Sequence, residues 1–213
     1  MQLISVNIGE KRTLQKGQEL ITTGIFKLPA SGRVRIGELG LEGDVIMDKK
    51  HHGGPDQAVY IYGEADYTWW RNQLGRDLPA GIFGENLTIS ELESASFNVG
   101  DVLTVGDVKL QVTAPRIPCS DFAARMEDLQ WVKKFRAGER PGLYCRVLQE
   151  GFVQAGDSVS VEKYAGETLS ILQMYRDHYQ SEKDEALIRR HLAAPIDIRT
   201  RKEMEELQTK GSR

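Results

Sequence analysis

The segment Val102-Leu103-Thr104-Val105-Gly106-Asp107-Val108-Lys109-Leu110-Gln111-Val112 has the pattern of two strands joined by a short turn. Aliphatic and β-branched residues dominate both halves, and the second half alternates apolar with polar residues, as a half-buried strand does. Gly106-Asp107 is a two-residue connection with glycine first, which is typical of a tight turn between antiparallel strands. The pattern predicts a β-hairpin over residues 102–112.

Short runs of the same kind recur over the first two-thirds of the chain, where glycine-rich turns separate them. So many short strands, with few helices between them, favour a closed, twisted β-barrel over a parallel sheet. We therefore class the fold as mainly β with α. The further expected strands cover residues 3–8, 20–26, 33–36, 58–62, 87–89, 143–148 and 158–161.

Two helical segments are expected among these strands. The first covers about residues 64–74 and carries Trp69 and Trp70, which we expect in the core or in an interface. The second begins after Ser120, a favourable N-cap residue. Its apolar stripe consists of Phe122, Met126, Leu129 and Val132.

The chain becomes helical in character after Tyr164. Three short helices can bury their apolar stripes against one another or against a barrel, and Pro195 ends the second of them. We therefore divide the chain into a β-barrel domain at 1–163 and a three-helix C-terminal subdomain at 164–213. The helices are marked by Leu169, Leu172 and Tyr175, by Leu187, Ile188, His191 and Leu192, and by Met204 and Leu207.

Composition argues against several classes of function. The 213 residues carry a formal net charge of −3, whereas a general nucleic-acid or membrane-surface binder needs a basic face. No apolar stretch approaches the length of a membrane span, and the first residues lack the pattern of a signal peptide. Two cysteines form no disulfide framework, so we expect a cytoplasmic protein. From the charge and the missing span we expect neither a nucleic-acid polymer nor a membrane as partner.

One of the cysteines ends the segment Pro115-Arg116-Ile117-Pro118-Cys119, at the expected junction between a strand and a helix. A thiolate is a nucleophile and a soft metal ligand, and a neighbouring arginine or a helix N-terminus favours it over the thiol. Arg116 and the helix beginning at Ser120 would supply both. Cys119 could equally be a small buried hydrophobe after a proline turn, the usual fate of a free cysteine. From spacing alone, the two interpretations have equal weight.

A second candidate segment is the loop over residues 40–59, where histidines, acidic residues and lysines crowd together. Gly53 and Gly54 would let backbone amides approach an anion closely. Taken alone, the loop favours the plainer interpretation of a solvated turn. A zinc site is disfavoured, because the adjacent histidines His51 and His52 would rarely share a metal.

Two further side chains leave alternatives open. Asn86 precedes an expected strand, where asparagine is more often a turn former than a ligand contact. Arg146 alternates with Cys145 along a strand, so it points away from that packed cysteine and toward either a cavity or water.

Together these segments resemble the MOSC domain, named for the C-terminus of the molybdenum cofactor sulfurase, and within it the stand-alone YiiM-like branch. The resemblance covers about residues 20–160, and the helical tail resembles the three-helix extension of that branch. It rests on the order and spacing of His52-Gly53-Gly54-Pro55-Asp56-Gln57-Ala58-Val59, Gly84-Glu85-Asn86-Leu87-Thr88, Pro115-Arg116-Ile117-Pro118-Cys119 and Tyr144-Cys145-Arg146-Val147-Leu148.

The resemblance implies a β-barrel that binds the molybdenum cofactor in its molybdopterin form, with Cys119 as the thiolate ligand of molybdenum. His52 and Asp121 are the candidate proton donors. An anionic cofactor needs cationic and amide donors, which Lys49 and Lys50 could also supply. The implied cofactor contacts are Lys27, Asp44, His52, Gly53, Gly54, Asn86, Arg116, Cys119 and Arg146.

The resemblance further implies a reductase of N-hydroxylated small molecules, such as hydroxylaminopurine-like base analogues. The chain lacks the four cysteines of an iron–sulfur cluster, so a separate reductase would have to donate electrons. The alternative is a carrier that passes the cofactor, or sulfur held as a Cys119 persulfide, to another protein. A third interpretation is an interaction module whose tail binds a partner. We also expect a homodimer.

Overall fold

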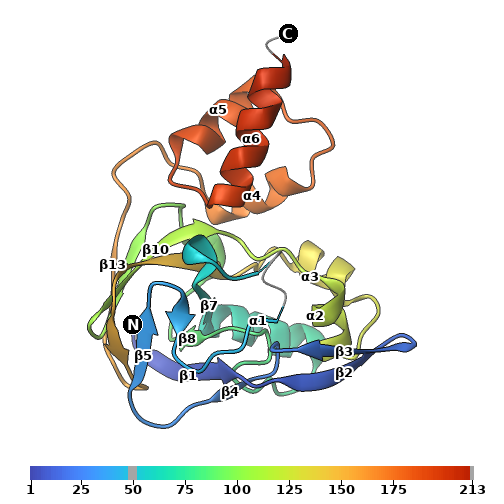
Figure 1. Ribbon diagram of the computed structural model, residues 1–213, viewed down its shortest axis with the longest axis vertical. Helices are drawn as coiled ribbons and strands as arrows, with labels where there is room; N and C mark the ends of the chain where they lie inside the picture. Colours follow the sequence, from blue (N-terminus) through green and yellow to red (C-terminus); the bar gives the residue numbers. More distant parts are fainter. Residues whose placement is uncertain (48–51, 212–213) are drawn as a thin grey trace.

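The computed structural model describes residues 1–47 and 52–211, and one curved sheet dominates it (Figure 1). Neighbouring strands of this sheet are antiparallel, apart from one parallel pair, β7 and β8, which α1 (Glu64–Leu74) connects. In pairing order the eight strands are β13 (Val159–Glu162), β9 (Val102–Val105), β10 (Val108–Ala114), β11 (Leu143–Gln149), β7 (Val59–Gly63), β8 (Leu87–Ile89), β1 (Leu3–Gly9) and β4 (Lys27–Pro29).

The predicted hairpin is confirmed as β9 and β10. Val105 pairs with Val108 across the turn, and Gly106 adopts a φ of +53°. A Cβ added to Gly106 would lie 2.6 Å from Oδ2 of Asp157. Both the backbone conformation and the lack of space therefore require glycine at this turn.

The sheet is not closed into a barrel, so the predicted closure is wrong. β13 and β4 are its two edge strands and do not pair with each other. An isolated bridge joins Gln2 to Ser158, but it does not extend into a ladder between strands. β4 has only 3 residues and ends at Pro29, which has no N–H with which to continue a ladder.

Two small sheets accompany the large one. β12 (Gly151–Val153), β5 (Val34–Gly37) and β6 (Gly40–Leu41) form the first, and β2 (Arg12–Lys16) and β3 (Glu19–Thr23) form the second. The strand expected over residues 20–26 ends at Thr23, and the chain pairs again only at β4. Between them Gly24 passes so close to the next loop that an added Cβ would lie 1.9 Å from the Val45 carbonyl oxygen.

The helix expected after Ser120 is two short helices. α2 (Ser120–Arg125) and α3 (Trp131–Gly138) are separated at Glu127, which takes a φ of +55° that no helix continues through. The side chain of Asp128 then accepts the backbone N–H of Gln130, just before α3 begins. Leu129 lies between the helices and is 95% exposed, so the expected continuous stripe is wrong.

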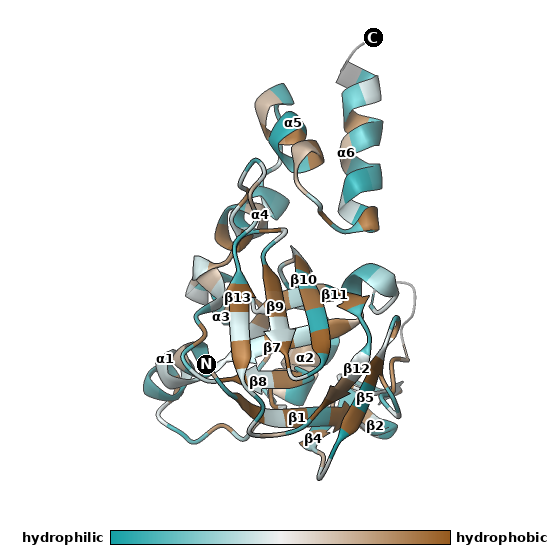
Figure 2. Cartoon of the chain, turned by 90° about the vertical axis from the view of Figure 1, so that its left-hand side faces the viewer, coloured by the Kyte–Doolittle hydropathy of each residue, from teal (hydrophilic) through white to brown (hydrophobic). Residues whose placement is uncertain are grey.

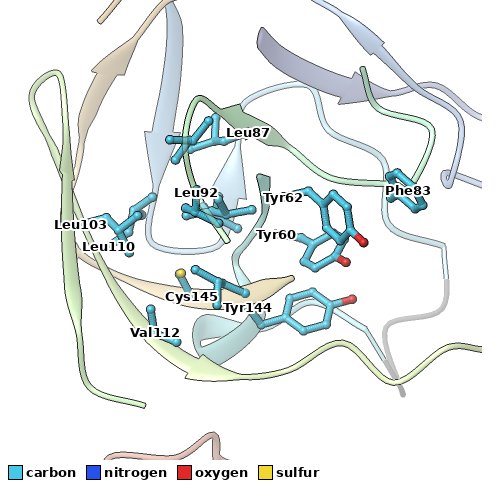
Figure 3. Packing of buried hydrophobic residues seen from close by; sticks show 14 of the residues in the cluster. Tyr60, Tyr62, Phe83, Leu87, Leu92, Leu103, Leu110, Val112, Tyr144 and Cys145 are labelled. Atoms are coloured by element: carbon cyan, nitrogen blue, oxygen red, sulfur yellow. The ribbon is translucent and has the colours of Figure 1, made fainter. Parts of the chain in front are cut away.

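The core between the sheet and α1–α3 has an aromatic part and an aliphatic part (Figure 3). Trp70 is buried, as expected, and its indole N–H donates to the Tyr62 hydroxyl at 2.8 Å. Cys145 packs among aliphatic side chains such as Leu103, and burial raises the pKa of its thiol. This cysteine is therefore structural.

The chain after Tyr164 contains α4 (Ile171–His178), α5 (Glu185–Ala193) and α6 (Ile198–Gly211), which lie beyond one end of the sheet (Figure 1). Leu169 and Met174 of the α4 region join the main core. α5 and α6 share a small cluster of their own around Leu187 and Met204, while the rest of α6 is mostly hydrophilic (Figure 2). Within the described residues, every helix is too short or too polar to traverse a lipid bilayer.

Candidate functional site

A cavity of about 300 Å³ opens where β3, β4, the loop after β6, β7 and the segment before α2 meet. These segments are distant in sequence, so only the fold brings their side chains together. Among the predicted site residues, the cavity is lined by Lys27, Asp44, His52, Gly53, Asn86, Arg116, Cys119 and Asp121.

Cys119 is the N-cap residue of α2, and its side chain is half-buried in the cavity wall. The backbone is extended there, and the helix begins at the next residue. Of the two interpretations of Cys119, a thiol that borders a cavity agrees with the structure, and a fully buried hydrophobe does not.

Arg116 lies beside this cysteine as a buried cation, 5% exposed. Its guanidinium lies 5.0 Å from the ring centre of Tyr60 and 4.6 Å from that of Phe122, and Nη1 donates to the Phe83 carbonyl oxygen at 3.0 Å. Its Nε has no hydrogen-bond partner among residues 1–47 and 52–211. A buried guanidinium in a cavity wall is suited to an anionic ligand.

Lys27, Asp44 and Asn86 form one hydrogen-bonded network in the same wall. The Lys27 ammonium lies 2.5 Å from Oδ2 of Asp44, and both side chains are almost completely buried. Asn86 Nδ2 donates to the same carboxylate at 2.9 Å, and the backbone N–H of Gly9 donates to Oδ1 at 2.7 Å. Burial lowers the pKa of Lys27, and the neighbouring carboxylate opposes that shift.

Asn86 is held in place by the protein at both ends of its amide. Its Oδ1 accepts the backbone N–H of Tyr60 at 3.1 Å, while Nδ2 is directed to Asp44. The asparagine therefore does more than form a turn before β8, because it links this strand to β7 and to the buried carboxylate.

The two candidate proton donors lie at the boundary of the cavity. Asp121 is on the first turn of α2, and its Oδ1 accepts from the Lys16 ammonium at 2.7 Å. That hydrogen bond raises the pKa of Lys16. His52 and Gly53 line the same cavity, whereas Gly54 does not. The predicted cations Lys49 and Lys50, and the neighbouring His51, lie outside the described residues.

Arg146 is not among the residues that line this cavity, so the geometry gives no support to the expected contact with a cofactor. Its Nε lies 2.9 Å from Oδ1 of Asp56, and Nη2 donates to the carbonyl oxygens of Pro195 and Ile196. Oδ2 of Asp56 accepts the first backbone N–H of α6, from Ile198, at 2.7 Å. Alternation along β11 correctly turned Arg146 away from Cys145, but the C-terminal segment covers that face.

A second cavity, of about 600 Å³, lies between the segment before α2 and the helices α4 and α6. His52, Gln57, Cys119, Asp121 and Tyr144 line both cavities, so the thiol borders each of them.

Sequence reasoning missed several of the lining residues. Gln57, Tyr60 and Tyr144 lie in or beside motifs that had been singled out, and their position there was the available signal. Lys16 and the polar α6 residues that line the second cavity, such as Arg199 and Glu203, lie in stretches with no distinctive pattern. Only the tertiary structure brings them to the site.

The arrangement offers chemistry for a bound anion next to a thiol. A half-buried sulfur, a buried guanidinium and an ammonium–carboxylate pair share one cavity, and an acid and an imidazole lie at the boundary with the second. Among the described residues, no cluster of three or more histidine, cysteine or acidic side chains could hold a metal ion by itself.

Comparison with known proteins places these residues in a sequence family. The model of the MOSC domain matches residues 48–160. The chain is 34% identical over 191 residues to the protein YflK of Bacillus subtilis (strain 168), covering 90% of this chain and 86% of YflK. It is 32% identical over 178 residues to a protein named "Reductase" from Gibberella moniliformis (strain M3125 / FGSC 7600), covering 82% of this chain but only 31% of that protein.

A solved structure shows the same fold over nearly the whole chain. The crystal structure of YiiM from Geobacillus stearothermophilus superposes with a TM-score of 0.79 at 27% identity, covering 96% of this chain and 97% of that one. The similarity therefore includes the C-terminal helices, which lie outside the matched domain.

Proposed function

This chain belongs to the MOSC domain family, and from that premise we propose that it binds the molybdenum cofactor and reduces N-hydroxylated compounds. The observation that supports the proposal best is the pairing of Cys119 with Arg116 in one cavity wall. The relative named as a reductase is consistent with this reaction class.

The residues present fit such a cofactor. When bound, it would supply a metal centre that accepts oxygen from the substrate and passes on two electrons. Cys119 offers the soft sulfur ligand that suits a metal already bound by sulfur. Arg116 offers a buried cation in the cavity wall for the anionic parts of the group. Lys27 fits less directly, because Asp44 already shares its ammonium.

The overall reaction converts R–NH–OH, two electrons and two protons into R–NH₂ and water. The nitrogen–oxygen bond breaks, the nitrogen is reduced, and the oxygen leaves as water. His52 and Asp121 border both cavities, and we assign to them the delivery of the protons. With Cys119 and Cys145 as the only cysteines in the sequence, the electrons come from a separate donor protein.

The test uses the chain's own second cysteine as a control. The protein is expressed in a host that makes the cofactor, molybdenum is measured by elemental analysis, and the pterin is detected as its fluorescent oxidised form. Reduction of a hydroxylaminopurine is then followed with an artificial electron donor. We expect Cys119→Ser to lose both molybdenum and activity, and Cys145→Ala to keep both.

Two outcomes separate this proposal from its competitors. A wild-type protein without molybdenum or pterin, or a Cys119→Ser variant that retains both, contradicts it. If the protein contains molybdenum but reduces no substrate by itself, and activity appears only after a cofactor-free acceptor enzyme is added, the protein is a carrier.

A further inference from the structure

The loop before β7, residues 52–57, connects the first cavity to the C-terminal helices, and we call it the cavity loop. His52, Gly53 and Gln57 of this loop line the first cavity. Asp56 belongs to the short helix η1 (Pro55–Gln57) and lines neither cavity. Its carboxylate instead contacts β11 and the start of α6. The cavity loop therefore has one side on the cavity and the other on the C-terminal helices.

Two carboxylates satisfy the start of α6. The first N–H groups of a helix have no acceptor within the helix. Oδ1 of Asp197 accepts the N–H groups of Arg199 and Thr200 at 3.1 and 3.2 Å. The N–H of Ile198 donates to Oδ2 of Asp56 at 2.7 Å, although the two residues are 142 positions apart. Because negative charge is favourable at a helix N-terminus, Asp56 stabilises α6 as a capping residue would.

Arg146 extends the connection to β11. Its Nε lies 2.9 Å from Oδ1 of Asp56. Its Nη2 donates to the carbonyl oxygens of Pro195 and Ile196, just before α6, at 3.1 and 3.0 Å. The side chains of Arg146 and Asp56 are only 26% and 20% exposed, so water screens the ion pair incompletely. Arg146 thus contacts the cavity loop and the approach to α6 together, while it lines neither cavity.

Two further contacts fix the backbone of the cavity loop. The Arg199 guanidinium donates to the carbonyl oxygen of Gly53 at 3.1 Å, so α6 also contacts the part of the loop that lines the cavity. Oγ1 of Thr113, on β10, donates to the carbonyl oxygen of Asp56 at 2.6 Å. The cavity loop is therefore positioned by β10, β11 and α6, three elements that are distant from it in sequence.

We propose that Asp56 and Arg146 are positioning residues for the first cavity, because they make the cavity loop and the start of α6 become ordered together. A ligand in the first cavity contacts the loop and favours its ordered state, and docking of α6 favours the same state. Two events that favour one state of a shared segment strengthen each other reciprocally. Loosening α6 should therefore loosen the cavity loop, and a ligand in the first cavity should tighten α6. The part that concerns the ligand rests on the proposed function.

The first experiment uses the full-length protein purified without cofactor. Arg146→Met removes the charge and the donors that contact Asp56 and α6, whereas Arg146→Lys keeps the charge. Arg35→Met is the matched control, because it breaks a 2.6 Å ion pair with Glu150 outside both cavities. NMR measures the order of the cavity-loop amides by nitrogen relaxation. It also measures the exchange of the Ile198 amide hydrogen, whose acceptor is Asp56.

We expect Arg146→Met to lower the order of the cavity loop and to raise the exchange rate of the Ile198 amide about 5–30-fold. Arg146→Lys should lie between the wild type and Arg146→Met, and Arg35→Met should match the wild type. Thermal unfolding confirms that each variant is folded. The inference is overturned if the cavity loop of Arg146→Met is as ordered as that of the wild type. If Arg146→Met does not fold, Arg146→Lys decides, and a loop equal to the wild type overturns the inference.

The second experiment tests the reverse direction and uses a host that makes the cofactor. We expect the Ile198 amide of the loaded wild type to exchange about fivefold or more slowly than that of the cofactor-free protein. Arg146→Met should retain less molybdenum than the wild type after the same purification, and Arg35→Met should retain as much. Equal exchange in loaded and cofactor-free wild type, or full molybdenum content in Arg146→Met, contradicts the reciprocal coupling.

The two proposals can fail separately. A wild type that takes up no molybdenum refutes the cofactor assignment, while the first experiment still decides whether the cavity loop and α6 are coupled. A wild type that loads molybdenum, together with an Arg146→Met variant whose cavity loop and molybdenum content are unchanged, refutes the positioning role alone.

Discussion

Removing Lys27 tests how strongly the stability of the protein depends on the buried ion pair between Lys27 and Asp44. In wild-type protein the side chains of Lys27 and Asp44 are only 8% and 4% exposed, respectively. Lys27→Met keeps the length of the side chain and removes its charge. The Asp44 carboxylate then retains two donors, the backbone N–H of Gly9 and Nδ2 of Asn86.

Breaking a buried pair from one side costs about 3–5 kcal/mol, because it leaves an uncompensated charge. Since two hydrogen bonds to the carboxylate remain, we expect Lys27→Met to lower the free energy of unfolding by about 3 kcal/mol, the lower end of that range. Asp44→Asn should cost somewhat less. Burial already lowers the pKa of Lys27, so the stranded amine can lose its proton.

The double variant Lys27→Met/Asp44→Asn carries no charge at either position. The new amide oxygen at position 44 still accepts from Gly9, but the new amide nitrogen faces Nδ2 of Asn86, so two donors meet without an acceptor between them. We expect a loss of about 1–2 kcal/mol, well below the sum of the single variants. Urea unfolding, followed by fluorescence with the slope of the transition compared, measures all four proteins. The coupling would be refuted if the losses of the two single variants summed to the loss of the double variant within about 0.5 kcal/mol.

Two further predictions concern the C-terminal helices. Asp56→Asn weakens the contacts to Arg146 and to the first N–H of α6. The amide hydrogens of α6 should then exchange with solvent about 5–30-fold faster, which is equivalent to about 1–2 kcal/mol. Unchanged exchange would show that other contacts hold the C-terminal helices. The pKa of His191 is lowered from 6.5 in the folded protein, so below that pH the unfolded chain binds more protons and stability falls as pH falls. His191→Gln should flatten the stability profile just below pH 6.5, as measured by thermal unfolding, whereas parallel profiles for the two proteins would contradict this assignment.

Much of the local structure followed from short patterns in the chain. The Gly106-Asp107 turn, the strands around it and the burial of Cys145 depend on neighbours in sequence, on backbone conformation and on alternation. The break in the helix after Ser120 was not predicted, because the helical spacing of apolar residues continues in the sequence across Glu127. In the structure Glu127 adopts a left-handed backbone conformation, which ends the helix. The prediction of a closed barrel was wrong for a different reason, because the number of strands does not determine whether the two edge strands pair.

The candidate site shows the same division. Motif order and spacing were enough to select Cys119, Arg116 and Asn86, which line one cavity. The pattern could not show that Asp44 neutralises Lys27, nor that Arg146 and Asp56 hold the tail instead of a ligand. These are contacts between segments far apart in the chain, and their partners are set by how the sheet curves and where the helices pack.

The amino-acid sequence alone determined the hairpin, most of the strands and the family resemblance, because these are encoded in local patterns and in the order of short motifs. It singled out Cys119 as a candidate site residue without deciding its role. Only the tertiary structure decided that the sulfur borders two cavities. The physical reason is that the charge balance of a cavity depends on which side chains are brought within a few ångströms of one another. Folding alone brings α4 and α6 to the far side of Cys119.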